Sequence, residues 1–335
     1  MRVLVSGGAG YVGSVSVEVL VAAGHEVVVL DDLSKGHREA LVPGVRLVEG
    51  SYGDPSVVRP ILEQGVDAVL HCAARSLVGE SVVNPALYYR ENVAGGVTFV
   101  EALREAGVRR VVFSSTAAVY GNPVEIPIRE DAVAAPINPY GETKRTFEGI
   151  LRWYAGAYGM RSICLRYFNV AGASARNGEV HEPETHLIPN VLRAVEGKGE
   201  LSLFGTDYPT PDGTCIRDYL HVEDLARAHL LAREATAPED PRTTTTDGGA
   251  AALAINLGNG GGFSVREVIA AAEAVTGLAV PVRVSPRRAG DPPSLVADAT
   301  RARQILGWEP NHRDIREIVA TAWAWRQAHP RGFAA

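Results

Sequence analysis

MRVLVSGGAGYVGSVSVEVLVAAGHEVVVLDD (residues 1–32) places an apolar run on each side of a longer stretch with helical spacing. The runs at 1–6 and 26–32 predict buried strands, and the stretch at 11–25 predicts a helix that stops at Gly24. A strand, a helix and a second strand within about 30 residues have the size of one βαβ unit. Because both strands are continuously apolar, the sequence predicts a parallel sheet covered on both faces.

The same alternation continues over the first half of the chain. Further strands are expected at 45–50, 67–74, 109–115 and 161–169, and the main helices at 85–106 and 140–158. Right-handed crossovers between parallel strands then give an α/β fold with a doubly wound parallel sheet, the Rossmann architecture.

The pattern changes after about residue 170, where glycine, proline and charged residues become frequent. We therefore predict a Rossmann domain over 1–170, to which segments near 214–232 and 254–260 return. The rest, mostly 171–335, is predicted to form a smaller mixed α/β domain that includes helices at 264–275 and 312–328. Two smaller expectations are a mobile surface loop at 236–252 and packing of the C-terminal helix by Trp308, Trp323 and Trp325.

Composition restricts the class of protein. The chain has 335 residues, is 46 % hydrophobic and carries a formal net charge of −6, with acidic and basic residues interspersed. No apolar run approaches the ~20 residues that a membrane helix needs, and the N-terminus shows no signal-peptide pattern. Cys72, Cys164 and Cys215 lie far apart without metal-site spacing. We expect a soluble cytoplasmic protein that binds neither membranes nor nucleic acid.

Glycines between the first strand and the first helix suggest a phosphate site. Gly7, Gly10 and Gly13 are spaced G-x-x-G-x-x-G, which differs from the commoner G-x-G-x-x-G. Such glycines let the backbone approach a pyrophosphate that sits on the helix N-terminal amides. Alone, the motif is also compatible with a plain glycine turn.

Asp31 strengthens this interpretation because it ends the second strand, where a carboxylate hydrogen-bonds the adenosine ribose. Asp32 adjoins it, and no arginine follows at once. A carboxylate repels a 2′-phosphate, so the combined motif predicts NAD rather than NADP.

Hydroxyl side chains follow the strand expected at 109–115, in FSSTAAVYG (113–121). Ligands of open α/β sheets sit at the carboxyl ends of strands, so Ser114, Ser115 and Thr116 are predicted to face the cofactor. Helix capping is the alternative role for such residues.

PYGETK (139–144) then places Tyr140 and Lys144 one turn apart on a helix that begins near Pro139. Only three of the 33 basic residues are lysines, so chance gives about 0.1 Tyr-x-x-x-Lys pairs in this chain. An ammonium is a compact point charge, whereas a guanidinium is a broad fork. The pair therefore indicates a site that requires lysine beside a phenol.

These motifs, in this order, resemble the extended short-chain dehydrogenase/reductase family, and within it the UDP-glucose (UDP-galactose) 4-epimerases. The resemblance covers essentially the whole chain. Its most specific segments are HCAARSLVGESV (71–82), YYRENVAGG (88–96), RYFNVAGA (166–173), FGTDYPTPDGTCIRDYLHVEDLA (204–226) and RRAGDPPSLVAD (287–298).

The resemblance implies an isomerase that epimerises a UDP-hexose at C4 through a transient 4-keto sugar, with NAD recycled. Tyr140 is implied as the acid/base, Lys144 as the ligand of the nicotinamide ribose and Thr116 as the partner of the reacting hydroxyl. The ammonium and the positive nicotinamide are expected to lower the Tyr140 pKa toward neutrality. The two domains then become an NAD-binding and a nucleotide-sugar-binding domain, and a homodimer through helices 85–106 and 140–158 is implied.

The remaining site residues come from the same resemblance. For NAD they are Gly7, Gly10, Tyr11, Val12, Gly13, Asp31, Asp32, Ser51, Tyr52, Cys72, Ala73, Ala74, Asn92, Ser114, Tyr140, Lys144 and Phe168. For the UDP-sugar they are Ser76, Thr116, Tyr140, Asn169, His186, Leu187, Leu203, Phe204, Arg217, Tyr219, Arg288, Asp291 and Leu295. Ser51, Ser76 and Leu295 depart from the usual family residues, and Leu295 leaves UDP-N-acetylhexosamines and UDP-pentoses open as substrates.

Three other functions were weighed. A dehydratase needs an acid and a base after Thr116, but Ala117 and Ala118 stand there. A non-catalytic NAD sensor usually lacks the tyrosine or the lysine of the pair. HEPETH (181–186) lacks His-Glu-x-x-His spacing on a helix, and Pro183 would break such a helix, so no metal site is predicted.

Overall fold

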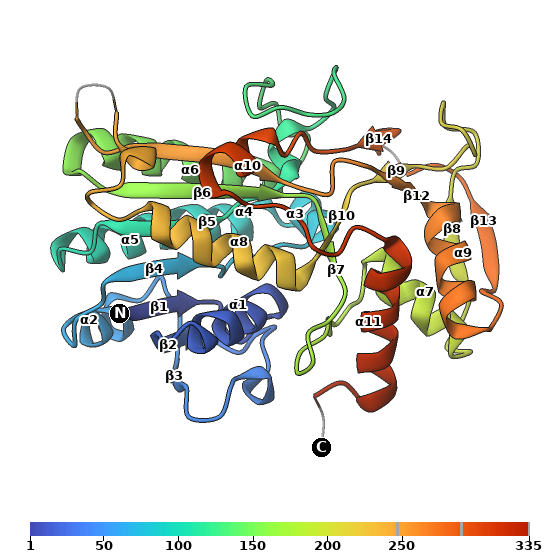
Figure 1. Cartoon of the computed structure of the whole chain (residues 1–335), viewed down its shortest axis with the longest axis horizontal. Coiled ribbons are helices and arrows are strands. Elements are labelled where there is room, and N and C mark those ends of the chain that lie inside the picture. The colour runs from blue at the N-terminus through green and yellow to red at the C-terminus, as the bar shows by residue number, and fades with distance from the viewer. Residues whose placement is uncertain (246–247, 289–290, 334–335) are drawn as a thin grey trace.

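A seven-stranded parallel sheet forms the centre of the computed structural model, which describes residues 1–245, 248–288 and 291–333 (Figure 1). The strand order is β11-β6-β5-β4-β1-β2-β3. The bounds are Arg2–Ser6 for β1, Glu26–Asp31 for β2, Arg46–Glu49 for β3, Ala68–His71 for β4, Arg110–Ser114 for β5, Arg161–Tyr167 for β6 and Ala252–Leu257 for β11. The predicted doubly wound α/β fold is confirmed.

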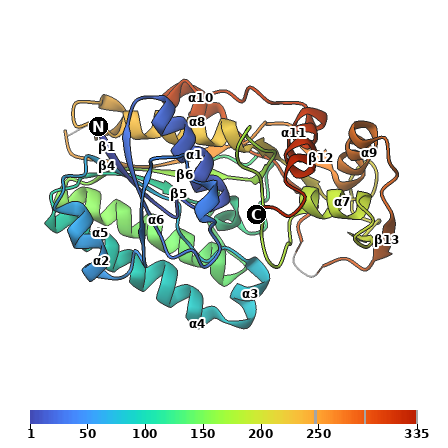
Figure 2. The same ribbon diagram turned by 90° about the horizontal axis from the view of Figure 1, so that it is seen from below.

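Helices cover both faces of this sheet because its strands are apolar on both sides (Figures 1 and 2). Val3 and Val5 of β1 face one core, and Leu4 between them faces the other. The first core is closed by α1 (Tyr11–Ala22), α8 (Val222–Ala235) and α10 (Thr300–Leu306). The second is closed by α2 (Pro55–Leu62), α5 (Gly96–Glu105) and α6 (Pro139–Tyr158).

The helix α6 starts and stops where local chemistry requires. The Asn138 side chain accepts the Gly141 amide at 2.8 Å, and Pro139 occupies the first helical position. Gly159 ends the helix with φ 69°, a left-handed conformation that glycine adopts without strain. These signals fix the rotation of α6, and therefore the face that presents Tyr140 and Lys144.

The expected helix at 85–106 is interrupted in the structure. It consists of α4 (Pro85–Tyr88), the π-helical segment η2 (Tyr89–Gly95) and α5, and it follows the short α3 (Val78–Val83). The π-helical turns carry Asn92, whose side chain is buried. Wide turns of this kind often mark functional positions.

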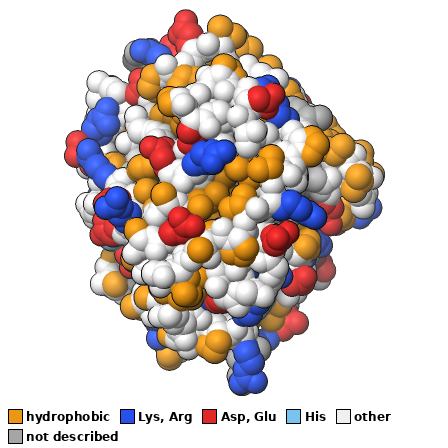
Figure 3. Space-filling view, turned by 90° about the vertical axis from the view of Figure 1, so that its right-hand side faces the viewer, with side chains coloured by type: hydrophobic (Ala, Val, Ile, Leu, Met, Phe, Trp, Pro, Cys, Tyr) orange, Lys and Arg blue, Asp and Glu red, His pale blue; other side chains and the backbone are white. Residues whose placement is uncertain are grey.

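A second, smaller lobe has its own apolar core, built by α7 (Leu187–Val195), α9 (Val265–Thr276) and α11 (Ile315–Ala328). Its strands are short: β8 (Leu201–Phe204) pairs with β13 (Val282–Ser285), and β9 (Ile216–Arg217) lies between β12 (Phe263–Ser264) and β14 (Ser294–Leu295). Figure 3 shows hydrophobic, acidic and basic side chains interspersed on the face of the molecule at this end.

Asp218 joins the small lobe to the central sheet. It follows β9 directly, is fully buried, and precedes β10 (Tyr219–His221), which pairs with β7 (Asn169–Ala171). Its carboxylate accepts the backbone amides of Asn259 at 2.7 Å and of Gly260 and Ala297 at 3.1 Å. One side chain thus fixes the segments that follow β9, β11 and β14.

The structure differs from two smaller expectations, for Trp308 and for the segment 236–252. Trp308 does not pack the C-terminal helix: it is fully buried in the core beneath α8, and its indole N–H donates to the Asp224 carbonyl at 2.9 Å. The segment 236–252 is not a simple surface loop, because it contains the 3₁₀ helix η4 (Pro241–Thr243) with Thr243 buried; residues 246–247 lie outside the described residues. Over the described residues, no helix is long and apolar enough to span a membrane.

A buried ion pair links the sheet to α6. Arg166 of β6 donates to both carboxylate oxygens of Glu148, at distances down to 2.6 Å, and both side chains are about nine-tenths buried. Arg166 also donates to the Tyr120 hydroxyl at 2.9 Å, which in turn donates to Asn256 at 2.6 Å. The network joins β6, β11 and α6 beside the strand ends.

We predict that Glu148→Gln lowers the free energy of unfolding by about 3 kcal/mol or more, because it leaves the buried guanidinium without its counter-charge. Urea unfolding followed by circular dichroism measures the change. Glu105→Gln is the matched control, because Glu105 pairs with Arg59 on the surface. This substitution is expected to lower the free energy of unfolding by less than about 1 kcal/mol. Equal losses in the two variants would contradict this role of the buried pair.

Candidate active site

The strand order reverses between β1 and β4, so the crossovers from these strands leave in opposite directions. The carboxyl ends of the parallel strands meet at one edge of the sheet, where open α/β folds bind ligands. Gly7, Asp31, Cys72, Ser114 and Phe168 end or follow five of these strands. The structure thus gathers cofactor positions that are spread over more than 160 residues of sequence.

The loop between β1 and α1 is shaped for close approach. Gly7 has φ +75°, and a Cβ atom on it would lie 2.4 Å from the Ala73 nitrogen. A Cβ on Gly13 would lie 2.0 Å from the Gly7 oxygen, whereas one on Gly10 meets nothing nearer than 3.5 Å. Gly7 and Gly13 are therefore required by packing, while Gly10 leaves the helix entrance open.

The first turn of α1 fits a pyrophosphate. Gly10 is its N-cap, and no side chain caps the amides of the turn. Uncapped amides at a helix N-terminus attract an anion. Tyr11 and Val12 begin the helix, and the Tyr11 hydroxyl donates to the Gly172 carbonyl at 2.7 Å, which leaves the backbone of the turn as the donor surface.

Asp31 lies where a ribose would be held. Its two oxygens accept the Ala9 and Leu33 amides at 2.9 Å each, and burial raises the pKa of this carboxyl. Each carboxylate oxygen can accept more than one hydrogen bond, so acceptor capacity remains for sugar hydroxyls. Asp32 instead accepts the Ser34 amide at 2.9 Å and stabilises the turn that follows.

Lys144 and Tyr140 lie side by side on α6 against the end of β5. The Lys144 ammonium donates to the Ser114 carbonyl at 2.7 Å and lies 4.6 Å from the centre of the Phe113 ring. Tyr140 hydrogen-bonds the Thr116 hydroxyl, and Lys144 Nζ lies 6.0 Å from the Tyr140 ring centre. The predicted catalytic set of Tyr140, Lys144 and Thr116 is thus brought together.

The expected lowering of the Tyr140 pKa is wrong for the protein alone. Burial raises the pKa of Tyr140 to about 12, and the hydrogen bond from Thr116 lowers it only in part. Burial also lowers the pKa of Lys144 to about 8. Desolvation favours the neutral form of each group and outweighs the attraction between them.

Sequence reasoning missed His229, which positions the end of β5. The Ser114 hydroxyl lies 2.7 Å from His229 Nε2, and His229 Nδ1 lies 2.9 Å from the Leu225 carbonyl. The carbonyl requires a proton on Nδ1, so Nε2 accepts from Ser114. Burial lowers the pKa of His229 to about 4 and keeps the ring neutral. In the sequence, His229 is one ordinary residue of an amphipathic helix and carries no motif.

Several predicted cofactor residues lie around the carboxyl-end edge of the sheet. The Asn92 amide group bonds both the amide and the carbonyl of Arg75, at 2.8 and 2.9 Å, and donates to Thr143. The loop that contains Ala73 and Ala74 is thereby tied to α6. The Tyr52 hydroxyl donates to the Glu91 carbonyl at 2.7 Å, and Ser51 Oγ accepts the Gly53 amide at 3.1 Å.

Cys72 and Ser76 lie on the loop after β4. Cys72 is close to the catalytic pair, since Ser114 Oγ lies 3.4 Å from its sulfur, and burial raises the pKa of the thiol to about 11. Ser76 is exposed to solvent. Phe168 is buried against Tyr120 and Ala297.

Four predicted substrate residues meet on the small lobe. Arg217 and Arg288 flank Asp291, with nitrogen-to-oxygen distances of 3.3 and 3.9 Å, and the Arg288 guanidinium lies 4.2 Å from the Phe204 ring centre. Leu295 is the strand partner of Arg217. A carboxylate between two arginines keeps them oriented for a phosphate group. The neighbouring positions 289–290 of the 287–298 segment lie outside the described residues.

Other predicted substrate residues have less exposed surface with which to contact a ligand. Tyr219 and Leu203 are only 3 % and 2 % exposed, so their side chains have almost no free surface. Leu187 packs on the core of the small lobe, and Asn169 is a half-buried residue of β7. His186 is half exposed and lies beside Glu179 and Glu184.

Comparison with known proteins agrees with this geometry. Residues 3–244 match the model of the NAD dependent epimerase/dehydratase family. UDP-glucose 4-epimerase of Lactobacillus helveticus is 48 % identical over 99 % of each chain. The crystal structure of UDP-glucose 4-epimerase from Brucella ovis in complex with NAD matches with TM-score 0.91 and 45 % identity, covering 97 % of this chain and 98 % of that one.

The enzyme of Bifidobacterium longum, solved in complex with NAD⁺ and UDP, matches with TM-score 0.90 and 32 % identity over 99 % of this chain and 100 % of that one. The resemblance expected from the sequence is therefore confirmed over the full length. The chain belongs to the NAD dependent epimerase/dehydratase family.

Proposed function

We propose that the protein is an NAD-dependent 4-epimerase of UDP-hexoses that interconverts UDP-glucose and UDP-galactose. The observation that carries the proposal is the meeting of Tyr140, Thr116 and Lys144 at the end of β5, beside the glycine loop at the end of β1. The proposal takes Tyr140 as the acid/base, Thr116 as its hydroxyl partner and Lys144 as the buried cation at the edge where the dinucleotide would bind. The similar enzymes described above carry the same activity in their names.

The amides of the first turn of α1 would hold the pyrophosphate of NAD and Asp31 its ribose, and the cofactor would supply the hydride acceptor and donor. Tyr140 takes the proton of the sugar 4-OH as C4 is oxidised, and returns it when the 4-keto sugar is reduced on its other face. Thr116 holds the same hydroxyl. The phenol keeps its proton up to about pH 12 in the protein alone, so a positive charge beside it is needed to favour the phenolate.

In this proposal, the small lobe binds the nucleotide end of the substrate. Arg217 and Arg288 bind the diphosphate and Phe204 lines the nucleoside. Leu295, the strand partner of Arg217, lies near the sugar. Because leucine is neither large nor very small, UDP-N-acetylhexosamines and UDP-pentoses are the alternative substrates.

A homodimer and a cytoplasmic location complete the proposal. Tyr89 of η2 and Trp153 of α6 are exposed apolar side chains within the two helices, 85–106 and 140–158, that the resemblance assigns to the dimer contact. Val82 and Val83 are also exposed, on α3, which packs on α6. All three cysteines are free, as expected for a reducing compartment.

Proton NMR of UDP-galactose mixed with the purified protein, without added cofactor, tests the reaction. We expect the anomeric signal of UDP-glucose to grow to a stable mixture. Tyr140→Phe is expected to retain NAD and to reduce turnover by about 10²–10⁴-fold, the range for general acid–base groups. Silence of the wild type even with added NAD contradicts the proposed substrate, and full activity of Tyr140→Phe contradicts the role of the phenol.

Lys144→Arg tests the requirement for a compact cation. The broader guanidinium does not fit between the Ser114 carbonyl and the Phe113 ring, so we expect a loss of about 100-fold in turnover through misplacement of Tyr140. Lys198→Arg is the matched control, because Lys198 is half exposed and pairs with Glu196. Equal activity of the two variants would mean that any cation serves at position 144.

Light scattering tests the homodimer. The wild type is expected at twice the chain mass, and Trp153→Glu at the chain mass, because it places a charge on the apolar face. Val124→Glu is the control, since Val124 is fully exposed on a different segment. A wild-type monomer refutes the dimer.

A further inference from the structure

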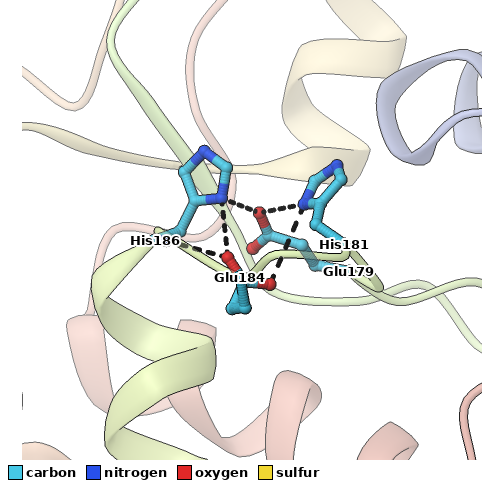
Figure 4. A group of neighbouring side chains, drawn as sticks. All are labelled: Glu179, His181, Glu184 and His186. Carbon is cyan, nitrogen blue, oxygen red and sulfur yellow. Dashed lines mark hydrogen bonds and ion pairs between the residues drawn. The ribbon is translucent and has the colours of Figure 1, made fainter. Parts of the chain in front are cut away.

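The segment between β7 and α7 brings together four side chains that sequence spacing did not connect. Glu179, His181, Glu184 and His186 turn toward one point (Figure 4). Their spacing is i, i+2, i+5 and i+7, and Pro183 lies among them, so no helix arranges them. The sequence excluded a metal motif on a helix, but here a loop brings the four side chains together.

The side chains approach one another to within 2.8–3.8 Å, and one ligand atom from each lies within 4.8 Å of the others. His186 Nδ1 lies 2.8 Å from Glu179 Oε1 and 2.9 Å from Glu184 Oε1. His181 Nδ1 lies 3.2 Å from Glu179 Oε1 and 3.8 Å from Glu184 Oε2. With bonds of about 2.0–2.1 Å, the ligand atoms of a tetrahedral ion lie about 3.3 Å apart. The observed separations bracket that value.

Burial and charge give a second, independent reason for a cation here. The side chains of Glu179 and Glu184 are 6 % and 5 % exposed, and in the part of the chain that the structure describes neither pairs with an arginine or lysine. His181 Nδ1 is buried, and its contacts with Glu179 and Glu184 do not have hydrogen-bond geometry. Two buried carboxylates need compensating positive charge, which an ion bound between them supplies.

We propose that Glu179, His181, Glu184 and His186 bind one divalent transition-metal ion of the zinc class. Imidazole nitrogens with carboxylate oxygens suit zinc rather than magnesium or calcium, which prefer oxygen ligands. Coordination through Nδ1 leaves the proton of each ring on Nε2. Because the protein supplies four ligands, the site is closed and structural, and does not open a catalytic position.

The ion would fasten this segment against the cofactor edge of the sheet. The His181 ring meets the ring of Tyr11 edge-on at 6.5 Å, and the Tyr11 hydroxyl donates to the Gly172 carbonyl. Lys35 Nζ, from the turn after β2, donates to the Glu182 carbonyl. The segment therefore touches both the glycine loop and the turn after Asp31 and Asp32.

The test uses untagged protein treated with a chelator and then dialysed. Zn²⁺ is titrated by calorimetry, and Co²⁺ by visible absorption, which reports tetrahedral coordination. We expect one equivalent of Zn²⁺ per chain and a tetrahedral Co²⁺ spectrum. Glu179→Gln and His186→Asn are expected to weaken Zn²⁺ binding at least ~10-fold, since even outer-shell changes cost that much. Circular dichroism confirms that each variant is folded, with His181→Asn as a further variant if one is not.

His312→Asn is the matched control, because it removes a donor from the second His–Glu group among the described residues, formed by His221, Glu223 and His312. This variant is expected to bind Zn²⁺ like the wild type. The proposal is overturned if the wild type binds no stoichiometric Zn²⁺, if Glu179→Gln and His186→Asn bind as tightly as the wild type, or if His312→Asn alone abolishes binding. Metal binding is measured without substrate, so its outcome is independent of the proposed epimerase activity.

Discussion

The hydrogen bond from the buried Lys144 ammonium to the Ser114 carbonyl is the contact on which the site depends. An ammonium removed from water must find acceptors nearby, and this one has the carbonyl at 2.7 Å and the face of the Phe113 ring. The contact holds α6 against the end of β5. It thereby sets Tyr140, one turn earlier on α6, beside Thr116, which follows β5. A chain that otherwise uses arginine keeps a lysine here because the space admits a point charge and not a fork.

Burial and charge oppose each other at this pair. In the protein alone, burial brings the pKa of Lys144 down to about 8 and that of Tyr140 up to about 12, so desolvation works against the charged form of each group. A positive charge beside the phenol favours the phenolate, and the phenolate then favours the charged ammonium. In the proposed reaction, a cationic cofactor therefore opposes the effect of burial on both groups.

The central sheet and the helix face that carries Tyr140 and Lys144 could be predicted from sequence because their signals are local. Continuous apolar runs define strands such as β1 and β2, and the spacing of Tyr140 and Lys144 defines one helix face. His229, Asp218 and Trp308 could not be assigned, because each acts through partners far away in the chain. The two-residue strands β9, β12 and β14 are also too short to show a period of their own. The rise that burial causes in the Tyr140 pKa could not be predicted either, because charge can be read from sequence, whereas desolvation depends on the completed core.

Epimerisation at C4 imposes a further constraint, since the sugar must present both of its faces to the same cofactor. The substrate must then be held firmly at its nucleotide end and loosely at its sugar end. The structure offers this division. Arg217 lies on β9 and is fixed by the Ile216 and Pro292 carbonyls, while the adjoining Asp218 binds three backbone amides. Thr116 and Tyr140 each offer only one hydroxyl to the sugar. So few contacts allow the sugar ring to rotate between oxidation and reduction. In the proposed reaction, a rigid anchor on the small lobe and few contacts at the strand ends would let one site reduce either face.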